Sequence, residues 1–277
     1  MSLNSVMQTA LSGMNAATTM VEVTANNVAN LQTEGFKQSQ VRLATLPSGG
    51  GQFPVGLGVI VTGIDLDASQ GAIVSDEPLP LLALEGEGFF ILEGEGGERQ
   101  FTRGGQFSLN GNYELVTTGG DRVLGYGLDE SGQIDRSQLM PLTIRLGSQA
   151  IGAGGHAATL NSYSIARSGR IVGRYSDGVS RTLGQLRLAR FANTAGLTQQ
   201  AGNKYQTTDA SAPPSEVDPG EAGAGEVLDG ATELSNVDLG RQLIELTLAG
   251  NMFRANAAVV RAADEMLGEL FFPWRRY

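Results

Sequence analysis

Both ends of the chain carry a seven-residue repeat of small and apolar residues, and this repeat constrains the fold more than any other feature. Near the N-terminus one stripe holds Leu3, Ala10, Ala17, Thr24 and Leu31, and a second, offset by four positions, holds Met7, Met14, Val21 and Val28. Near the C-terminus the same spacing connects Leu239, Leu246, Phe253, Val260 and Leu267. Two helices with such heptad stripes are expected to pair as a coiled coil.

The residues of these stripes are mostly small, which limits the stability of a single helix pair. Alanine, glycine and threonine let helices approach closely but bury little apolar surface, at about 25 cal/mol per Å². Ordering the backbone costs about 1–2 kcal/mol per residue. The termini of an isolated molecule are therefore predicted to be largely disordered and to gain stability from further helices. The alternative is a pair of ordinary amphipathic helices that lie on the middle domain.

Polar residues mark the inner boundaries of the two helices. Asn30 and Gly35 are typical of a helix end, and Ser235 with Asp238 is typical of a helix start. Asn26 and Asn27 lie too far inside the first helix to act as caps, so we expect their side chains to bond another helix.

The middle of the chain has the features of β structure. Short apolar runs such as 89–92 follow glycine turns, and alternating segments flank Asn110-Gly111 and Asp177-Gly178, both of which favour hairpins. The predicted organisation is therefore mixed, with a coiled coil formed by both chain ends and a central all-β domain. Its segments are an N-terminal helix (1–35), an extended connector with some strand (36–84), the β domain (85–205), an acidic Pro/Gly linker (206–234) and a C-terminal helix (235–277).

Composition excludes several classes of function. The chain has no cysteine and one histidine, His156, so disulfides, thiolate nucleophiles and multi-histidine metal sites are excluded. The net charge of −10 is unfavourable for binding nucleic acid. We expect no catalytic residue, no cofactor and no metal. Neither a signal peptide nor a membrane-spanning run is evident, which predicts a soluble protein or one exported without a cleaved signal.

Charge is unevenly distributed along the second half of the chain. Residues 137–208 contain seven arginines and Lys204 against one acidic residue, Asp177. Residues 209–238 contain eight acidic residues and no basic one. We therefore hypothesise that the acidic segment runs across the arginine-rich segment, in the same subunit or in a neighbouring one. A solvated sheet surface is the alternative.

Three separated motifs resemble those of the flagellar rod and hook protein family. The first is Ala25-Asn26-Asn27-Val28-Ala29-Asn30 followed by Thr33, Gly35, Phe36 and Lys37. The second combines Gly86-Glu87-Gly88-Phe89-Phe90 with Phe101-Thr102-Arg103-Gly104-Gly105-Gln106-Phe107. The third is Ser235-Asn236-Val237-Asp238-Leu239 with the helix that follows. Their order covers both ends and the domain between them.

The resemblance implies an axial structural protein of the flagellum, not an enzyme. Such a protein is exported by the flagellum's own secretion apparatus and polymerises helically around a central channel, next to other rod and hook subunits. Its terminal helices form the inner tube and its β domain an outer layer, without insertion into a membrane. The motif residues carried over are Asn26, Asn27, Asn30 and Gly35 in the terminal helix and Phe89, Phe90 and Arg103 in the β domain. The candidate sites also include Asn236 among the assembly residues and Gly86, Gly88 and Phe107 among the β-domain motif residues.

The length of 277 residues favours a subunit of the distal rod, because hook subunits typically carry an additional outer domain. A short hook protein is the alternative within the family, since residues 164–193 resemble the later β segment of hook proteins. A secreted adhesin whose coiled coil gathers β domains is the alternative from another class. The tail from Phe271 to Tyr277 is aromatic and basic, unlike the usual leucine-rich ending.

Overall fold

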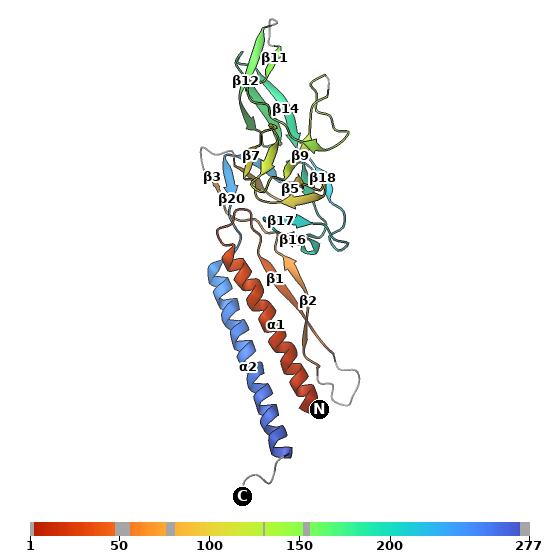
Figure 1. The fold of residues 1–277 in the computed structure, drawn as a ribbon, viewed down its shortest axis with the longest axis vertical. Helices are drawn as coiled ribbons and strands as arrows, with labels where there is room; N and C mark the ends of the chain where they lie inside the picture. The colour runs from red at the N-terminus through yellow and green to blue at the C-terminus, as the bar shows by residue number, and fades with distance from the viewer. Residues whose placement is uncertain (1–2, 48–55, 76–80, 130, 152–155, 272–277) are drawn as a thin grey trace. The chain divides into compact units, whose positions relative to one another are not determined.

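The computed structural model describes residues 3–47, 56–75, 81–129, 131–151 and 156–271. The chain divides into two compact units. The helical unit comprises Met1–Leu31, Gln38–Asp67 and Val237–Tyr277, and the β unit comprises Gln32–Lys37 and Ala68–Asn236. The predicted helix at each end and the predicted β-rich centre are confirmed (Figure 1). The tail at 272–277 lies outside the described residues.

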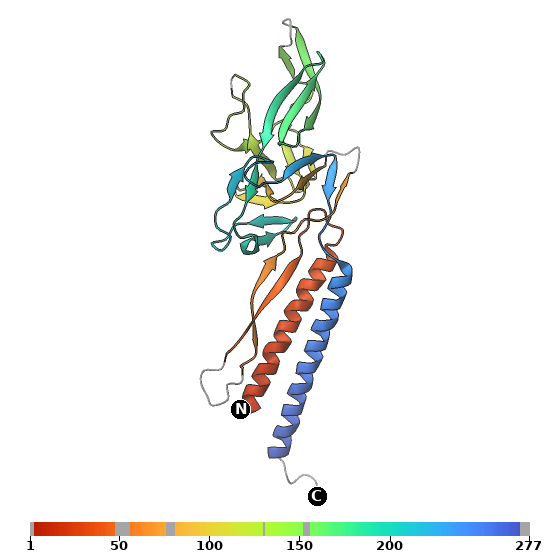
Figure 2. The same ribbon diagram turned by 180° about the vertical axis from the view of Figure 1, so that it is seen from behind.

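The helical unit consists of two long helices and one β ribbon. Helices α1 (Leu3–Ala29) and α2 (Leu239–Phe271) run antiparallel, side by side (Figures 1 and 2). Strands β1 (Ser39–Thr45) and β2 (Val59–Leu66) pair antiparallel and also contact α1. Within the segment expected to be an extended connector with some strand, β1 and β2 form a hairpin that packs on α1. No helix in the described residues is long and apolar enough to cross a membrane.

Both helices are shorter at their inner ends than the sequence predicts. Helix α1 stops at Ala29, and the N–H of Asn30 bonds the carbonyls of both Asn26 and Asn27, at 3.2 and 3.1 Å, as the helix tightens into a turn. Helix α2 is capped by Asp238, whose Oδ1 accepts the N–H of Arg241 at 3.0 Å. The N-cap is therefore Asp238 itself, in a position that satisfies an otherwise free backbone donor.

The β unit contains one large sheet and two small ones. In the described residues, strands β5 to β18 form a 14-stranded sheet with the main path β11-β12-β13-β14-β9-β5-β6-β17-β16. Strand β19 pairs with β4, and β20 pairs with β3. The bounds are β3 (Ile73–Ser75), β4 (Leu82–Glu85), β5 (Phe89–Glu93), β6 (Arg99–Thr102), β7 (Phe107–Leu109), β8 (Leu115–Thr117), β9 (Arg122–Tyr126), β10 (Met140–Pro141), β11 (Gln149–Ile151), β12 (Ala157–Ile165), β13 (Arg170–Tyr175), β14 (Ser180–Leu186), β15 (Leu188–Arg190), the 3₁₀ turn η1 (Thr194–Gly196), β16 (Thr198–Gln200), β17 (Lys204–Gln206), β18 (Ser215–Val217), β19 (Glu226–Asp229) and β20 (Ala231–Glu233).

Both predicted hairpins are present. Asn110 and Gly111 connect β7 to β8, and the Oδ1 of Asn110 accepts the N–H groups of Asn112 and Glu114, both at 2.9 Å. Asp177 and Gly178 connect β13 to β14, with Gly178 at a φ of 77° that suits glycine. The turn chemistry of these residues therefore fixes the strand register locally.

The segment 206–234, expected from its composition to be an acidic Pro/Gly linker, contains three strands. It supplies β18, β19 and β20, which pair with strands far away in the sequence. Val227 and Ala231 are buried, at 0 and 2% exposure. Prolines and glycines shape the turns between these strands, and arginines of the β unit neutralise several of the acidic side chains.

Candidate functional site

A chain of buried amide side chains joins the two helices to the ribbon in the helical unit. The Nδ2 of Asn27, near the end of α1, donates to the Oε1 of Gln242 in the first turn of α2 at 3.1 Å. The Nε2 of Gln242 donates to Gln38 at 3.2 Å, and the Nε2 of Gln38 donates to Asp67 at 2.7 Å. Asn27, Gln38 and Gln242 are at most 5% exposed.

Asn27 also holds the start of β1. Its Oδ1 accepts the N–H of Ser39 at 2.9 Å, and its Nδ2 donates to the Ser39 carbonyl at 2.9 Å. The amide of Asn27 thus has partners in α2 and in β1, and losing one would leave a buried polar group unsatisfied. The prediction that Asn27 bonds another helix is confirmed. Asn26 differs: it is exposed, and its carbonyl accepts the side-chain amide of Asn30 at 2.9 Å.

Small residues line the contact between α1 and α2. A Cβ added to Gly13 would lie 2.6 Å from the Nδ2 of Asn256, so a larger residue there would collide with the Asn256 side chain across the helix pair. Most buried positions of α1 follow one another at three or seven residues, as expected for one helix face. The buried residues are Ala10, Gly13, Ala16, Ala17, Thr24 and Asn27 on α1 and Gln242, Ala249 and Ala263 on α2.

The structure places the predicted stripe residues differently along the two helices. Ala10 and Ala17 are buried, as expected for the inner face, whereas Met7, Met14, Val21 and Val28 are half-buried. On α2 the predicted stripe does not face α1: Leu239, Leu246 and Phe253 are exposed, and Val260 and Leu267 are half-buried. The small or polar residues at 242, 249, 256 and 263 take the inner face because they permit the close approach.

In the β unit a glutamate, a lysine and an arginine form a buried charge cluster. The Oε1 of Glu233 accepts the Nζ of Lys37 at 2.7 Å, and its Oε2 accepts the Nε of Arg103 at 2.5 Å. The three side chains are between 1 and 4% exposed. Breaking a buried ion pair typically costs about 3–5 kcal/mol, because the remaining charge has no partner.

Backbone carbonyls accept further hydrogen bonds from the two basic side chains of this cluster. Arg103 donates to the carbonyls of Gly88 at 2.5 Å, Gly86 at 2.5 Å and Leu84 at 3.0 Å. Lys37 donates to the carbonyl of Ser69 at 2.6 Å. Arg103 therefore fixes the path of the chain around the predicted motif glycines Gly86 and Gly88, whose φ values are 113° and 132°.

The backbone of Gly35 packs against this cluster. Its N–H donates to the carbonyl of Glu233 at 2.7 Å, and its φ is 62°. A Cβ at this position would lie 2.6 Å from the N atom of Gly104. Both the conformation and the close approach require glycine.

Three aromatic motif residues lie in the interior beside this cluster. Phe89 and Phe90 point to opposite faces of β5, as successive strand residues do. Phe90 meets Phe107 edge to face at 5.0 Å between ring centroids. Phe89 meets Tyr205 at 5.6 Å, and burial, with the nearby Glu233 charge, raises the pKa of the Tyr205 hydroxyl above its ordinary 10.0.

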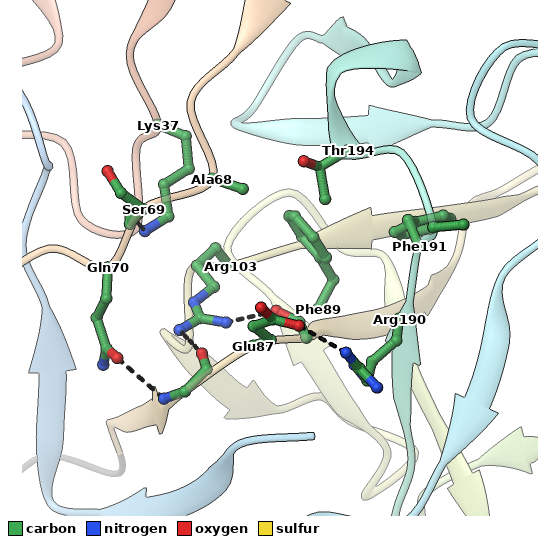
Figure 3. Close-up of a pocket in the computed structure, with 13 residues that line it drawn as sticks. Lys37, Ala68, Ser69, Gln70, Glu87, Phe89, Arg103, Arg190, Phe191 and Thr194 are labelled. Atoms are coloured by element: carbon green, nitrogen blue, oxygen red, sulfur yellow. Dashed lines mark hydrogen bonds and ion pairs between the residues drawn. The ribbon is translucent and has the colours of Figure 1, made fainter. Parts of the chain in front are cut away.

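A cavity of about 630 Å³ lies next to the charge cluster. Figure 3 shows Lys37 and Arg103 on one side of it and Phe191 and Thr194 on the other, with Phe89 between them. At its rim Glu87 pairs with Arg190 at 2.7 Å. None of the described residues form a group of three or more acidic or histidine side chains able to hold a metal ion.

The acidic segment does contact the arginine-rich segment within one subunit, as hypothesised. Asp218 pairs with Arg187, and Glu226 pairs with Arg167 at 3.1 Å. Arg181 instead pairs with Asp177 at 2.7 Å. The contact therefore involves only part of the arginine-rich segment.

Comparison with known proteins matches all three parts of the chain. The flagella basal body rod protein model matches residues 7–37, the flagellar hook protein FlgE/F/G D1 domain model matches 83–173, and the flagellar basal body rod FlgEFG protein C-terminal model matches 228–271. The basal-body rod protein FlgG of Buchnera aphidicola subsp. Baizongia pistaciae is 30% identical over 94% of this chain and 96% of that protein. The chain belongs to the flagellar rod and hook protein family.

The chain matches rod proteins of this family over a larger part of its length than it matches a hook protein. The rod protein FlgG of Bacillus subtilis is 30% identical over 94% of this chain and 95% of its own length. The hook protein FlgE of Brucella abortus is 37% identical, but over only 47% of this chain and 33% of that protein. This chain therefore matches these rod proteins from end to end and this hook protein only in part.

The buried clusters connect the three matched segments. Lys37, Arg103 and Glu233 each come from a different one, and Asn27 and Gln242 join the first to the third. Sequence reasoning singled out Asn27 and Arg103 but missed Glu233 and Gln242. Gln242 could have been found, because it is a polar residue three positions after Leu239 and four before Leu246. Glu233 is hidden among seven other acidic residues of its segment.

Proposed function

We propose that this chain is a structural subunit of the distal part of the flagellar rod, which polymerises helically around a central export channel. The end-to-end similarity to FlgG rod proteins supports the rod. The partial match to a hook protein argues against a short hook subunit. The role is mechanical, and we propose no catalytic residue, cofactor or metal.

The observation that carries this proposal is the exposed apolar surface of α2. Leucine, isoleucine, phenylalanine, valine and methionine side chains on this helix are between 38 and 63% exposed, while its small and polar residues face α1. Exposed apolar side chains in this number along one helix mark surface that binds protein. The residues are Leu239, Leu243, Ile244, Leu246, Leu248, Phe253, Val259 and Met266.

We propose that the large residues of the predicted stripes act between subunits. In this arrangement α1 and α2 pair as a coiled coil through their small residues, and the exposed face of α2 packs on helices of neighbouring copies to form the inner tube. Each further helix would bury apolar side chains worth about 1.5–3 kcal/mol each. The assembly residues proposed are Met7, Ala10, Met14, Ala17, Val21, Asn26, Asn27, Val28, Asn30, Asn236, Leu239, Leu246, Phe253, Val260 and Leu267.

The proposed partners are other copies of this chain, the adjacent rod and hook subunits, and the flagellar export apparatus. The proposed location is the basal body, between the periplasm and the cell surface, with export that needs no cleaved signal. We propose no insertion into the membrane and no nucleic-acid partner. A secreted adhesin with a closed oligomer is the alternative, and the rod relatives argue against it.

Deletion of the gene and complementation test this proposal. Cells without the chain should lack hooks, because no distal rod would be present to support them. The wild-type gene should restore the distal rod and the hooks. A variant with Leu243→Asp and Leu248→Asp should fail to restore them although it is exported. Arg254→Asp, an exposed change on the same helix outside the apolar set, is the matched control. Normal hooks in the deletion strain would contradict a rod function.

A further inference from the structure

A further cavity of the β unit, the arginine pocket, is lined by three arginines. Its volume of about 600 Å³ lies within the range of about 300–1,000 Å³ found for ligand sites. The guanidinium groups belong to Arg136, Arg170 and Arg181, and none of the described residues that line the pocket is acidic. Tyr175 and Leu183 make part of its wall apolar. The pocket therefore has the character of a site for an anionic group.

Two of these arginines keep hydrogen-bond donors that no described residue accepts. Arg170 is exposed on β13 and forms no ion pair with any described residue. Arg181 pairs with Asp177 at 2.7 Å and lies over the ring of Tyr175, 4.5 Å from its centroid. The Nη1 of Arg181 is nevertheless buried without a hydrogen-bond partner in the described part of the chain. A buried donor of this kind is costly unless an acceptor reaches it.

The acidic residues around the third arginine already have partners. Arg136 pairs with Asp218 at 3.0 Å, and Arg187 binds the same carboxylate. Asp129 and Asp135 precede Arg136 in its loop, but each accepts backbone N–H groups of that loop at 2.8–2.9 Å. None of these carboxylates lines the pocket. The positive charge of the pocket is therefore not balanced from within it.

The turn between β5 and β6 has the opposite charge. Residues 94–98 consist of three glycines and two glutamates, Glu95 and Glu98. Both glutamates are exposed, and neither forms an ion pair with a described residue. Glu98 accepts the side-chain amide of Gln100 at 3.2 Å. Because glycine has no side chain, this acidic turn presents two carboxylates on a narrow stretch of backbone.

The acidic turn does not reach the arginine pocket of its own copy. Glu93, just before the turn, pairs with Arg122 at the start of β9. Arg170 pairs with Gln185, and Gln185 pairs with Tyr126 at the end of β9 (Figure 1). The two sites are thus separated by four residues along the strands and by the steps β13-β14-β9-β5 across the sheet, about 13 Å and about 14 Å. A glutamate and an arginine side chain do not span this separation.

We propose that the arginine pocket of one copy binds the acidic turn of a second copy. Guanidinium groups bind carboxylates through charge-assisted hydrogen bonds, and Glu95 and Glu98 supply two carboxylates for Arg170 and Arg181. The contact joins two different surfaces, so its repetition produces an open filament and not a closed dimer. The inference rests on the proposed function, because it needs a polymer of this chain.

Zero-length cross-linking in purified hook–basal bodies tests this contact. A carbodiimide joins an amine to a carboxylate in contact with it and takes up the water that is lost. The natural chain has two lysines: Lys37 is 1% exposed, and Lys204 pairs with Asp121 at 2.9 Å. Arg170→Lys keeps the charge, places an amine at the pocket and should give a ladder of linked oligomers. Arg174→Lys, an exposed change on the same strand outside the pocket, is the matched control and should give none.

A second probe and the identity of the linked carboxylate make the result decisive. Gln133→Lys, at another exposed position of the pocket, guards against unfavourable geometry at Arg170. Peptide mass spectrometry should find the link at Glu95 or Glu98, and replacing both by glutamine should abolish the ladder.

Three results would overturn the inference while the proposed function stands. They are basal bodies that contain the chain but give no ladder with either probe, a ladder linked through other carboxylates, and a link to a different protein. If the chain is absent from basal bodies, the proposed function fails and the inference fails with it.

Discussion

The Nδ2 atom of Asn27 and the Oε1 atom of Gln242 lie 3.1 Å apart, in a buried hydrogen bond between residues 215 positions apart in the chain. This bond joins the end of α1 to the start of α2. A buried amide pair in an otherwise small and apolar helix contact sets the register, because any shift would leave polar groups without partners.

Asn27→Ala is expected to weaken the helical unit by about 1–3 kcal/mol, the typical cost of an unsatisfied buried polar group. The N–H of Ser39 and the amide of Gln242 would both lose a partner. The urea concentration that dissociates isolated rods measures the effect. Asn26→Ala, an exposed change at the neighbouring position, should leave that concentration unchanged. Equal effects of the two substitutions would contradict a register role for Asn27.

Gly13→Ala is expected to impair rod assembly, since the new Cβ would lie 2.6 Å from the side chain of Asn256. Asn256→Ala in the same chain should restore assembly by making room. Gly250→Ala is the control, because no atom lies within 4 Å of a Cβ there. That change should be neutral or stabilise α2 by about 0.5–1 kcal/mol. Hook–basal body yield from complemented cells provides the measurement, and a lack of rescue would argue against the close helix approach.

Glu233→Gln is expected to destabilise the β unit by about 3–5 kcal/mol, because Lys37 and Arg103 would remain buried without a counter-charge. Urea unfolding of the full chain, monitored by the far-UV circular dichroism signal of β structure, would detect this loss of stability. Glu87→Gln removes a carboxylate from an exposed ion pair, and its expected cost is below about 1 kcal/mol. A small effect at position 233 would show that the cluster is not a stabilising feature.

The stability of the β unit should fall at alkaline pH because of Tyr205. The pKa of its hydroxyl is raised in the folded chain, so the folded state keeps its proton above pH 10 while the unfolded state loses it. Stability from this group is therefore fully present below about pH 10 and declines as the pH rises further. Tyr205→Phe should flatten this decline in unfolding free energy measured between pH 9 and 11. An unchanged pH profile in the variant would contradict the assignment.

The helices and hairpins could be predicted because their signals are local. Heptad spacing marks both helices, and Asn110-Gly111 and Asp177-Gly178 mark two turns. The inner face of α2 was predicted wrongly, because hydrophobicity pointed to Leu246 and Phe253 although a close helix contact needs Ala249 and Ala263. On α2, large apolar side chains therefore mark exposed surface, whereas small residues mark the contact with α1.

The acidic segment shows the other limit of local reasoning. Residues 206–234 have the composition of a linker, yet β19 and β20 within them pair with strands more than a hundred residues away, for example Val227 with Leu84. The partners of Asp218 and Glu226 are arginines that are distant in sequence. Long-range pairing of this kind leaves no periodic signal in a single sequence. The Glu233 cluster was missed for the same reason.

Immunogold labelling of purified hook–basal bodies tests the central claim most directly, with an antibody raised against residues 85–205. The proposed function predicts gold on the rod, just below the hook. Gold along the curved hook would contradict the rod assignment in favour of a short hook protein. Basal bodies without gold, from cells in which an immunoblot finds the chain elsewhere, would contradict an axial function altogether.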